Sequence, residues 1–267
     1  MDNLTHSFVG LAASKAGLER LSPGTTAACL IATNAPDGDI LSLLFGDRWT
    51  YLHHHRGITH SLVGTLVLAL LIPLVFFVGD RIIAHLRQRS PSVKPGGLTL
   101  ASLIVSASHP FMDWTNSYGI RPLLPWNPKW FYGDLVFIVD PFIWLMIGGA
   151  AFLLTSKTRK QIALWTVLGS ILTFIVLFAA DRPPLTSLGW TRAFWVAALI
   201  FLIFFRLKLV QRWGENIAQV SFALLLLYWG SLAIIHRYAL ADGRREAASI
   251  VGTHGENVVD VAAMPTL

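Results

Sequence analysis

The sequence predicts an all-α fold: a polytopic helix bundle that is integral to a membrane and begins with an N-terminal helical hairpin. Of its 267 residues, 54% are hydrophobic and only 13% are charged, about half the roughly 25% charged residues of a typical soluble domain. The mean hydropathy is +0.57. Apolar stretches that approach the roughly 20 residues of a bilayer-spanning helix recur along the chain. Composition and segment length together therefore indicate a membrane protein.

Six apolar stretches are long enough, or nearly long enough, to be membrane helices. They cover residues 58–79, 98–112, 135–155, 162–180, 190–205 and 217–235. Two shorter apolar stretches come first, at residues 4–20 and 24–35, separated by a Ser22-Pro23-Gly24 turn. We expect these two to form the N-terminal hairpin, either buried in the bundle or partly inserted into the membrane.

Three regions of the chain differ in their motifs and composition, and no linker sequence separates them. Residues 1–155 carry every motif described below, and residues 156–240 add further apolar helices of the same bundle. Residues 241–267 are polar and rich in small residues, so we expect a disordered tail there. The sequence predicts one membrane domain without a separate soluble domain.

The net charge is +6 and the pI is about 9.8. In a soluble protein this would suggest nucleic-acid binding, but here Lys and Arg lie mainly between apolar stretches, the pattern that sets the orientation of a membrane protein. No basic aromatic face or nucleic-acid motif accompanies them, so we expect no nucleic-acid partner. The single cysteine, Cys29, excludes an internal disulfide and a Cys-rich zinc site.

A six-residue motif occurs twice near the N-terminus. Thr5–Gly10 reads THSFVG and Thr59–Gly64 reads THSLVG, so the two copies differ at one position. Each copy opens an expected helix, for which Thr5 or Thr59 could act as the N-cap. The match is either an internal duplication or an accident of a short motif.

The second helix of each repeated unit ends in Pro-x-x-Asp, at residues 36–39 and 110–113. In an antiparallel hairpin, the start of the first helix lies beside the end of the second. We therefore expect His6 to lie near the first Pro-x-x-Asp motif and His60 to lie near His109 and the second. All of these polar residues then fall at one end of the bundle.

Ionisable side chains at membrane depth are costly and usually functional, although any one of them alone could cap a helix or face interfacial water. Imidazole and carboxylate ligands together suit zinc, manganese or iron. His109 and Asp113 are four residues apart, which places them on one face of a helix. We predict a site for one or two divalent metal ions, with zinc first and manganese or iron as alternatives. The predicted ligands are His6, Asp37, Asp39, His55, His60, His109 and Asp113.

Two more residues are candidates for catalysis. Arg56 lies between two of the predicted ligands and could clamp a phosphate or carboxylate, or it could anchor the chain at the membrane interface. Asp140 begins a later helix at the same end of the bundle, where it could orient a ligand or act as a general base. The sequence contains no Gly-rich phosphate loop and no Gly-x-Ser-x-Gly nucleophile motif.

These motifs resemble a known family. Thr5-His6, Pro36–Asp39, His55–Ser61 (HRGITHS) and His109–Asp113 (HPFMD) are similar to the YdjM-like family of predicted bacterial membrane-bound metal-dependent hydrolases. The resemblance covers roughly residues 1–150 and implies a metal site and a hydrolytic reaction, without defining a substrate. The order of the His and Asp residues is also similar to that of zinc-dependent phospholipase C enzymes, but the further downstream His ligands of those enzymes are missing.

The sequence therefore predicts a membrane-bound hydrolase in which metal-activated water attacks an ester, and a phosphoester first of all. A site at the membrane surface makes membrane lipids its natural partners and a lipid or lipid-linked molecule its natural substrate. Two other classes stay open. A metal- or proton-coupled transporter would place its ionisable groups near the midplane, and a non-catalytic membrane protein would hold a structural metal with a closed coordination sphere.

The expected location is the inner (plasma) membrane, which the chain crosses several times. The loops opposite the predicted site carry more Lys and Arg than the loops on its own side, with a basic group at Arg81, Arg87, Arg89 and Lys94. Because Lys and Arg are enriched in cytoplasmic loops, we expect the site to face the periplasm or the cell exterior.

Overall fold

The computed structural model describes residues 1–179, 188–208, 210–254 and 261–263. These residues form helices joined by loops, with isolated bridges as the only β-type pairing among them. The all-α prediction is therefore confirmed. The α-helices are α1 (Asn3–Lys15), α2 (Thr25–Asn34), α3 (Arg48–His54), α4 (Leu62–Leu86), α5 (Pro95–Trp114), α6 (Pro141–Ile143), α7 (Gly149–Thr155), α8 (Arg159–Phe174), α9 (Leu188–Lys208), α10 (Val210–Trp213) and α11 (Asn216–His254).

Shorter helical turns connect several of these helices. Three are 3-10 helices, namely η1 (Leu18–Arg20), η2 (Ala35–Leu44) and η3 (Ile58–His60). Two are π-helical turns, η4 (Trp144–Gly148) and η5 (Ile175–Ala179). The turns η2 and η3 matter most for function, because they follow α2 and precede α4 at the end of the molecule where the candidate residues gather.

Four helical segments are long and apolar enough to cross a membrane. They are Leu62–Leu86, Arg159–Phe178, Gly189–Lys208 and Asn216–Ser249. Most of their side chains face away from the protein interior, as expected for helices surrounded by lipid. The predicted stretch 98–112 is also helical, within α5. In the predicted stretch 135–155, the helix begins only at Pro141, so the apolar helix there is shorter than predicted.

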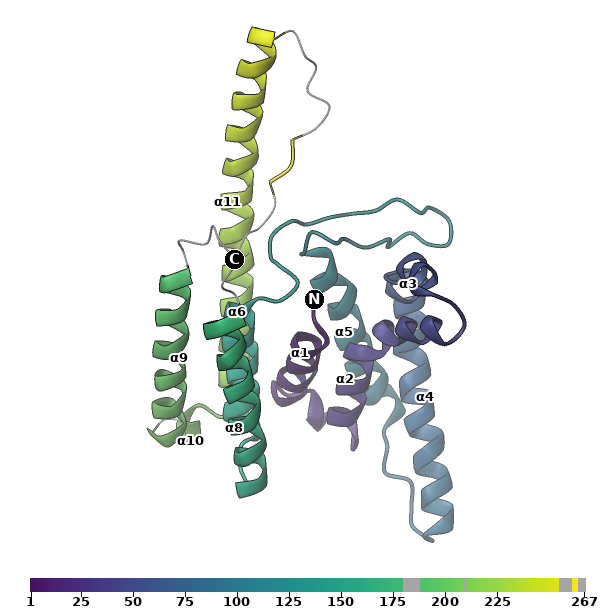
Figure 1. Cartoon of the computed structure of the whole chain (residues 1–267). Coiled ribbons are helices and arrows are strands. Elements are labelled where there is room, and N and C mark those ends of the chain that lie inside the picture. Colours follow the sequence, from purple (N-terminus) through teal and green to yellow (C-terminus); the bar gives the residue numbers. More distant parts are fainter. Residues whose placement is uncertain (180–187, 209, 255–260, 264–267) are drawn as a thin grey trace.

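The N-terminal half consists of two antiparallel hairpins, as predicted. α1 packs against α2, α4 packs against α5, and α2 joins the two pairs by packing against α5. The turn between α1 and α2 uses Gly17 (φ 129°) and Gly24 (φ 84°) in backbone conformations that favour glycine. Figure 1 shows the start of α1, helix α3 and the loop after α5 at the same end of the molecule.

The caps of the two repeated helices differ from those expected. Asp2 caps α1 by accepting the backbone N–H of Thr5 at 2.9 Å. Ser61 caps α4 by accepting the N–H of Gly64 at 3.1 Å. Thr5 already lies inside its helix, and Thr59 belongs to the 3-10 turn before α4. The expected threonine caps were therefore wrong, because α1 begins earlier, and α4 later, than the motif suggested.

The C-terminal helix is longer than expected. α11 continues to His254, past residue 240, where the sequence suggested that a disordered tail begins. Residues 239–249 (ALADGRREAAS) contain many Ala, Arg and Glu residues, which are strong helix formers. Residues 255–260 and 264–267 lie outside the described residues.

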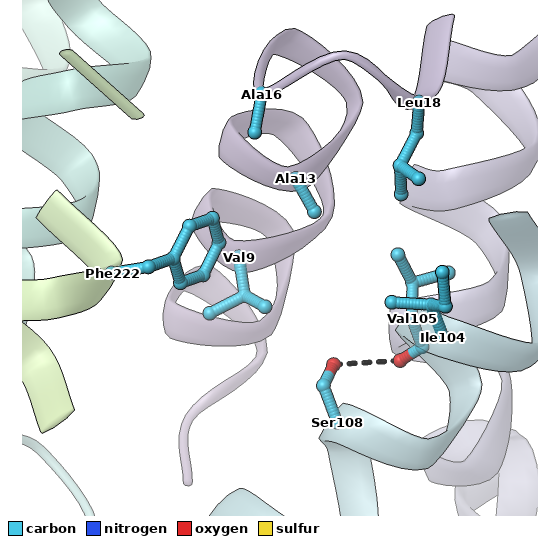
Figure 2. A pocket seen from close by; sticks show the side chains of 8 residues that line it. All are labelled: Val9, Ala13, Ala16, Leu18, Ile104, Val105, Ser108 and Phe222. Atoms are coloured by element: carbon cyan, nitrogen blue, oxygen red, sulfur yellow. Dashed lines mark hydrogen bonds between the residues drawn. The ribbon is translucent and has the colours of Figure 1, made fainter. Parts of the chain in front are cut away.

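An apolar cavity of about 300 Å³ lies between the N-terminal helices and the C-terminal helix α11. It lies between α1, α5 and α11, and Figure 2 shows Phe222 of α11 facing Val9 and Ala13 of α1. The hydroxyl of Ser108, which also lines the cavity, donates a hydrogen bond to the carbonyl of Val105 at 2.7 Å. None of the predicted ligands lines this cavity, so the candidate site lies elsewhere.

Each copy of the repeated motif ends in a glycine, at a position where any larger residue would collide with neighbouring atoms. A Cβ atom on Gly64 would lie 1.8 Å from the carbonyl oxygen of Ile58. A Cβ atom on Gly10 would lie 2.6 Å from Oγ1 of Thr33. The glycines therefore allow the η3 turn to fold against α4 and allow α1 to approach α2.

We expect Gly64→Ala to lower the free energy of unfolding by about 1–3 kcal/mol, because the new methyl group collides with the backbone of the η3 turn. Gly79 is a matched control in the same helix, because a Cβ atom there would meet nothing within 4 Å. Gly79→Ala should be neutral or stabilising by up to about 1 kcal/mol. Unfolding in mixed detergent micelles measures both, and equal effects at the two positions would contradict the close contact.

Candidate metal centre

Four side chains from three separate segments meet at one point. Asp37 comes from η2, His60 from η3, and His109 and Asp113 from the end of α5. One ligand atom from each of the four lies within 4.8 Å of the others. The Nε2 atoms of His60 and His109 are 3.0 Å apart. Nε2 of His60 is also 3.3 Å from Oδ1 of Asp37 and 3.3 Å from Oδ2 of Asp113.

This cluster is buried and has polar atoms without hydrogen bonds. His60, His109 and Asp113 are almost fully buried, and Asp37 is 11% exposed. Among the described residues, Oδ2 of Asp37 and Oδ2 of Asp113 make no hydrogen bond. Oδ2 of Asp113 does lie 3.3 Å from Nε2 of His60 and 3.3 Å from Nε of Arg56, as ion pairs without hydrogen-bond geometry. Buried carboxylate oxygens without hydrogen bonds are costly, and a divalent cation would satisfy both of them. Two imidazoles and two carboxylates also form a ligand set that suits zinc, so these residues fit a metal ion.

The two imidazole rings are held so that their Nε2 atoms point into the cluster. Nδ1 of His109 lies 2.6 Å from the carbonyl oxygen of Thr33, to which it can only donate. In a neutral His109 ring this leaves Nε2 with its lone pair directed at the cluster. Nδ1 of His60 lies 3.0 Å from Oγ1 of Thr59 and 3.6 Å from a carboxylate oxygen of Asp39. Such outer hydrogen bonds typically orient metal-binding histidines.

A second group shares Asp37 with the first. Asp37, Asp39 and His55 also place one ligand atom each within 4.8 Å of one another. Asp39 contacts Nδ1 of His55 at 3.1 Å and accepts the backbone N–H of Arg56 at 3.0 Å. His55 is 18% exposed, so this second group lies on the more accessible side of the cluster.

The cluster is electrostatically coupled. Burial by itself would lower the pKa of His60, but its contacts with Asp113 and Asp37 outweigh burial and raise that pKa above its usual value. Burial by itself would raise the pKa of Asp37, but its contacts with His60 and His109 outweigh burial and lower that pKa. The surroundings therefore favour a positive charge on His60 and a negative charge on Asp37.

Arg56 is buried and holds Asp113 of the cluster in place. Its guanidinium donates hydrogen bonds to Oδ1 and the backbone carbonyl of Asp113, to Oδ1 of Asn116 and to the carbonyl of Gly119. It also lies over the ring of Tyr118, 4.5 Å from its centre. These contacts occupy the fork of the guanidinium. Arg56 is therefore placed to fix Asp113 and the following loop, and its predicted use as a substrate clamp gains no support from this geometry.

His6 lies beside the four-residue cluster. Its ring stacks on that of His109, with the ring centres 3.8 Å apart, and its Nε2 is 3.3 Å from Oδ1 of Asp113. The amino group of Met1 contacts the same oxygen of Asp113. His6 belongs to neither of the two metal-ligand groups, although it lies close enough to influence Asp113.

Asp140 belongs to neither of the two ligand groups. One of its carboxylate oxygens caps α6 by accepting the N–H groups of Phe142 and Ile143, and the other accepts the hydroxyl of Tyr228 at 2.8 Å. Burial raises the pKa of Asp140 above its usual value. The described contacts give Asp140 a capping role, and they do not link it to the predicted ligands.

Sequence reasoning missed the groups that orient the histidines. The carbonyl of Thr33 holds His109, but a backbone acceptor leaves no signature in a sequence. Tyr51 stacks on His55, with ring centres 4.8 Å apart, and only its spacing of four residues in α3 could have indicated that contact. The predicted juxtaposition of the two repeated hairpins, in contrast, is observed.

Comparison with known proteins agrees with the motifs. The family model described as YdjM inner membrane protein matches residues 1–184. Uncharacterized protein YfhP of Bacillus subtilis (strain 168) is 28% identical over 189 residues, which cover 67% of this chain and 50% of that protein. Inner membrane protein YbcI of Escherichia coli (strain K12) is 30% identical over 158 residues, which cover 58% of this chain and 80% of that protein. This chain thus spans about half the length of YfhP.

No solved structure matches the chain. The family model covers more than half of the sequence, and its matched region contains both repeated hairpins and every residue of the His and Asp cluster. The four helices that are long and apolar enough to cross a membrane agree with a family of inner membrane proteins. This chain therefore belongs to the YdjM inner membrane protein family.

Proposed function

We propose that the protein is a metal-dependent hydrolase that cleaves esters, phosphoesters first among them, at one face of the inner membrane. The observation that carries this proposal is the convergence of two imidazole Nε2 atoms and two buried carboxylates on one point. Asp37, His60, His109 and Asp113 would hold the ion. Zinc is the preferred metal, and manganese or iron would also suit these ligands.

When bound, such an ion lowers the pKa of a coordinated water toward about 7 and stabilises charge that develops on the substrate. The protein supplies the positioning. The carbonyl of Thr33 and the hydroxyl of Thr59 orient the two imidazoles, and Arg56 fixes Asp113. In the overall reaction a water oxygen bonds to phosphorus, the bond from phosphorus to the ester oxygen breaks, and that oxygen leaves with a proton. Water can enter beside Asp37, the least buried member of the cluster.

We further propose that the centre takes two ions. Asp37 belongs to both ligand groups, so it could contribute to holding one ion with His60, His109 and Asp113 and another with Asp39 and His55. Paired ions about 3.5–4 Å apart are common in enzymes that cleave phosphoesters. The second site has fewer protein ligands and more exposure, so its ion should bind more weakly.

The geometry supports hydrolysis over the two rival functions. A transporter would hold its ionisable groups near the middle of the membrane, whereas this cluster lies where α5 ends and before α4 begins. Asp80, which is buried in α4, is engaged by Arg89, Ser92 and Val93 beyond the far end of that helix. A purely structural metal would have a closed shell of ligands, whereas Asp37 and His55 remain partly accessible.

Metal content tests the ligand assignment. Purified wild-type protein loaded with zinc should hold two ions per chain by elemental analysis. Asp39→Asn should retain one, because only the more exposed site loses a ligand, and His60→Ala and Asp113→Asn should lose the buried ion. His85→Ala is a matched control, because His85 lies exposed near the far end of α4. Unchanged metal content in both His60→Ala and Asp113→Asn would refute the assignment.

Hydrolysis of soluble model compounds tests the reaction. We expect the wild type to cleave bis(p-nitrophenyl) phosphate faster than a peptide of similar size, to lose activity on chelation and to regain it with zinc or manganese. His109→Ala should lower the rate at least about 100-fold, more than is usual for the loss of an outer-shell partner, whereas His85→Ala should not. Activity that survives complete chelation would exclude a metal-dependent reaction.

We propose that the centre faces the periplasm or the cell exterior, since the loop between α4 and α5 is basic and basic loops favour the cytoplasm. This loop lies at the end of α4 opposite to His60. A reporter fused after Lys94 should therefore be active as a green fluorescent protein and inactive as alkaline phosphatase. The reverse pattern would place the centre on the cytoplasmic side.

A further inference from the structure

The segment between the two ligands Asp39 and His55 exposes a series of large apolar side chains. Its η2 portion and the turn into α3 contain Ile40, Leu41, Leu43, Leu44 and Phe45, all of them exposed, and Trp49 follows in α3. Phe45 is 89% exposed and Leu44 is 74% exposed. We call residues 40–49 the apolar segment. Contiguous exposed apolar surface of this kind marks a contact with a membrane or another protein.

The apolar segment adjoins a membrane helix whose outer side is also apolar. Turn η2 packs against η3 and the beginning of α4. Ile58 of η3 is exposed, and so are Leu62, Leu66 and Leu70 along the outer side of α4. α4 is one of the four helices long and apolar enough to span a membrane. Exposed apolar side chains therefore occur both on the spanning helix and on the segment that packs against it.

The composition of the apolar segment also matches a position at the membrane interface. Asp47 and Arg48 are charged and exposed, and Asp47 caps α3 by accepting the N–H of Thr50 at 2.9 Å. Trp49 is exposed next to them. Apolar side chains beside charged groups and an exposed Trp are typical of segments that lie among lipid headgroups.

The apolar segment adjoins the accessible side of the metal centre. In a 3-10 helix residues three apart line up, so Ile40 follows Asp37 along η2 and Leu43 follows Ile40. Asp37 and His55, the most exposed members of the two ligand groups, lie before and after the apolar segment in the chain. The apolar segment therefore connects the two most accessible ligands along the backbone.

We propose that the apolar segment lies in the headgroup layer of the bilayer and that the metal centre takes its substrate sideways from the membrane. The substrate would be a membrane lipid whose phosphoester lies near the headgroup, while its acyl chains stay against the apolar segment and α4. This substrate class rests on the proposed hydrolase function, whereas the membrane contact of the apolar segment does not.

Depth measurements with nitroxide labels test the membrane contact. Labels would be placed at Leu44→Cys and Phe45→Cys in vesicles of phosphatidylethanolamine and phosphatidylglycerol, and the native Cys29 is buried. Leu70→Cys on the outer side of α4 and Ser90→Cys in the exposed far loop are the hydrocarbon and aqueous references. We expect labels at 44 and 45 to be more accessible to oxygen than to a water-soluble nickel complex, at a depth between those of the two references.

Two results would overturn the membrane contact. Labels at 44 and 45 that match Ser90→Cys would place the apolar segment in water. Labels protected from both oxygen and nickel, with spin–spin broadening, would show that a second copy of the chain covers the apolar segment instead of lipid.

Activity on two kinds of substrate tests sideways entry. The double variant Leu44→Asp, Phe45→Asp should cleave phosphoesters of lipids in the same vesicles at least tenfold more slowly than the wild type. Its cleavage of soluble bis(p-nitrophenyl) phosphate and its metal content should not change. Ser90→Asp adds a negative charge to the far loop and should leave both substrates unaffected.

Equal losses on lipid and soluble substrates would overturn sideways entry, because the apolar segment would then affect the centre itself. Wild-type activity on the soluble phosphoester but not on the vesicle lipid would overturn the lipid substrate and keep the hydrolase. Wild-type activity on neither substrate would instead refute the proposed function, together with the lipid substrate that rests on it, and the label positions would still decide the membrane contact.

Discussion

The approach of His60 and His109 governs the arrangement of the N-terminal half. Their Nε2 atoms lie 3.0 Å apart, buried beside carboxylate oxygens of Asp37 and Asp113 that make no hydrogen bond. Burying such groups without partners costs free energy, so the surrounding structure must hold them in place or a cation must join them. The two hairpins, the outer hydrogen bonds and the guanidinium of Arg56 all serve to maintain this single point of contact.

Two of the supporting contacts come from elements that do not supply ligands to the buried centre. The carbonyl of Thr33 in α2 orients His109, and Arg56 in the loop after α3 holds Asp113 and the loop beyond α5. Arg56 has a positive φ of 52°, a conformation that is uncommon outside glycine. The candidate metal centre thus links backbone from α2 and η2, from the turn around η3 and from the end of α5, and the hairpin packing of the helices brings these stretches together.

Much of this arrangement follows from the sequence. The repeated THS motif and the two Pro-x-x-Asp motifs, with the rule that hairpin ends meet, predicted which end of the bundle would hold His60 and Asp113. Spacing alone could not distinguish a ligand from a neighbour. The stacking of His6 on His109, the occupied guanidinium of Arg56 and the capping role of Asp140 depend on side-chain directions that only packing sets. The exposed residues 40–49 also escaped notice, because a short apolar run in a sequence is normally read as buried.

Arg56 has a consequence for the order in which the protein is made. Its most distant partner along the chain is Gly119, and both ligand groups lie between Asp37 and Asp113. All of these contacts therefore involve residues that leave the ribosome before α8, α9 and α11 have been synthesised. Every residue of the His and Asp cluster is therefore present in the chain before the later helices are made, and an ion that binds the cluster could be held while translation continues. The order of synthesis thus separates the residues of the candidate site from the helices that complete the membrane bundle.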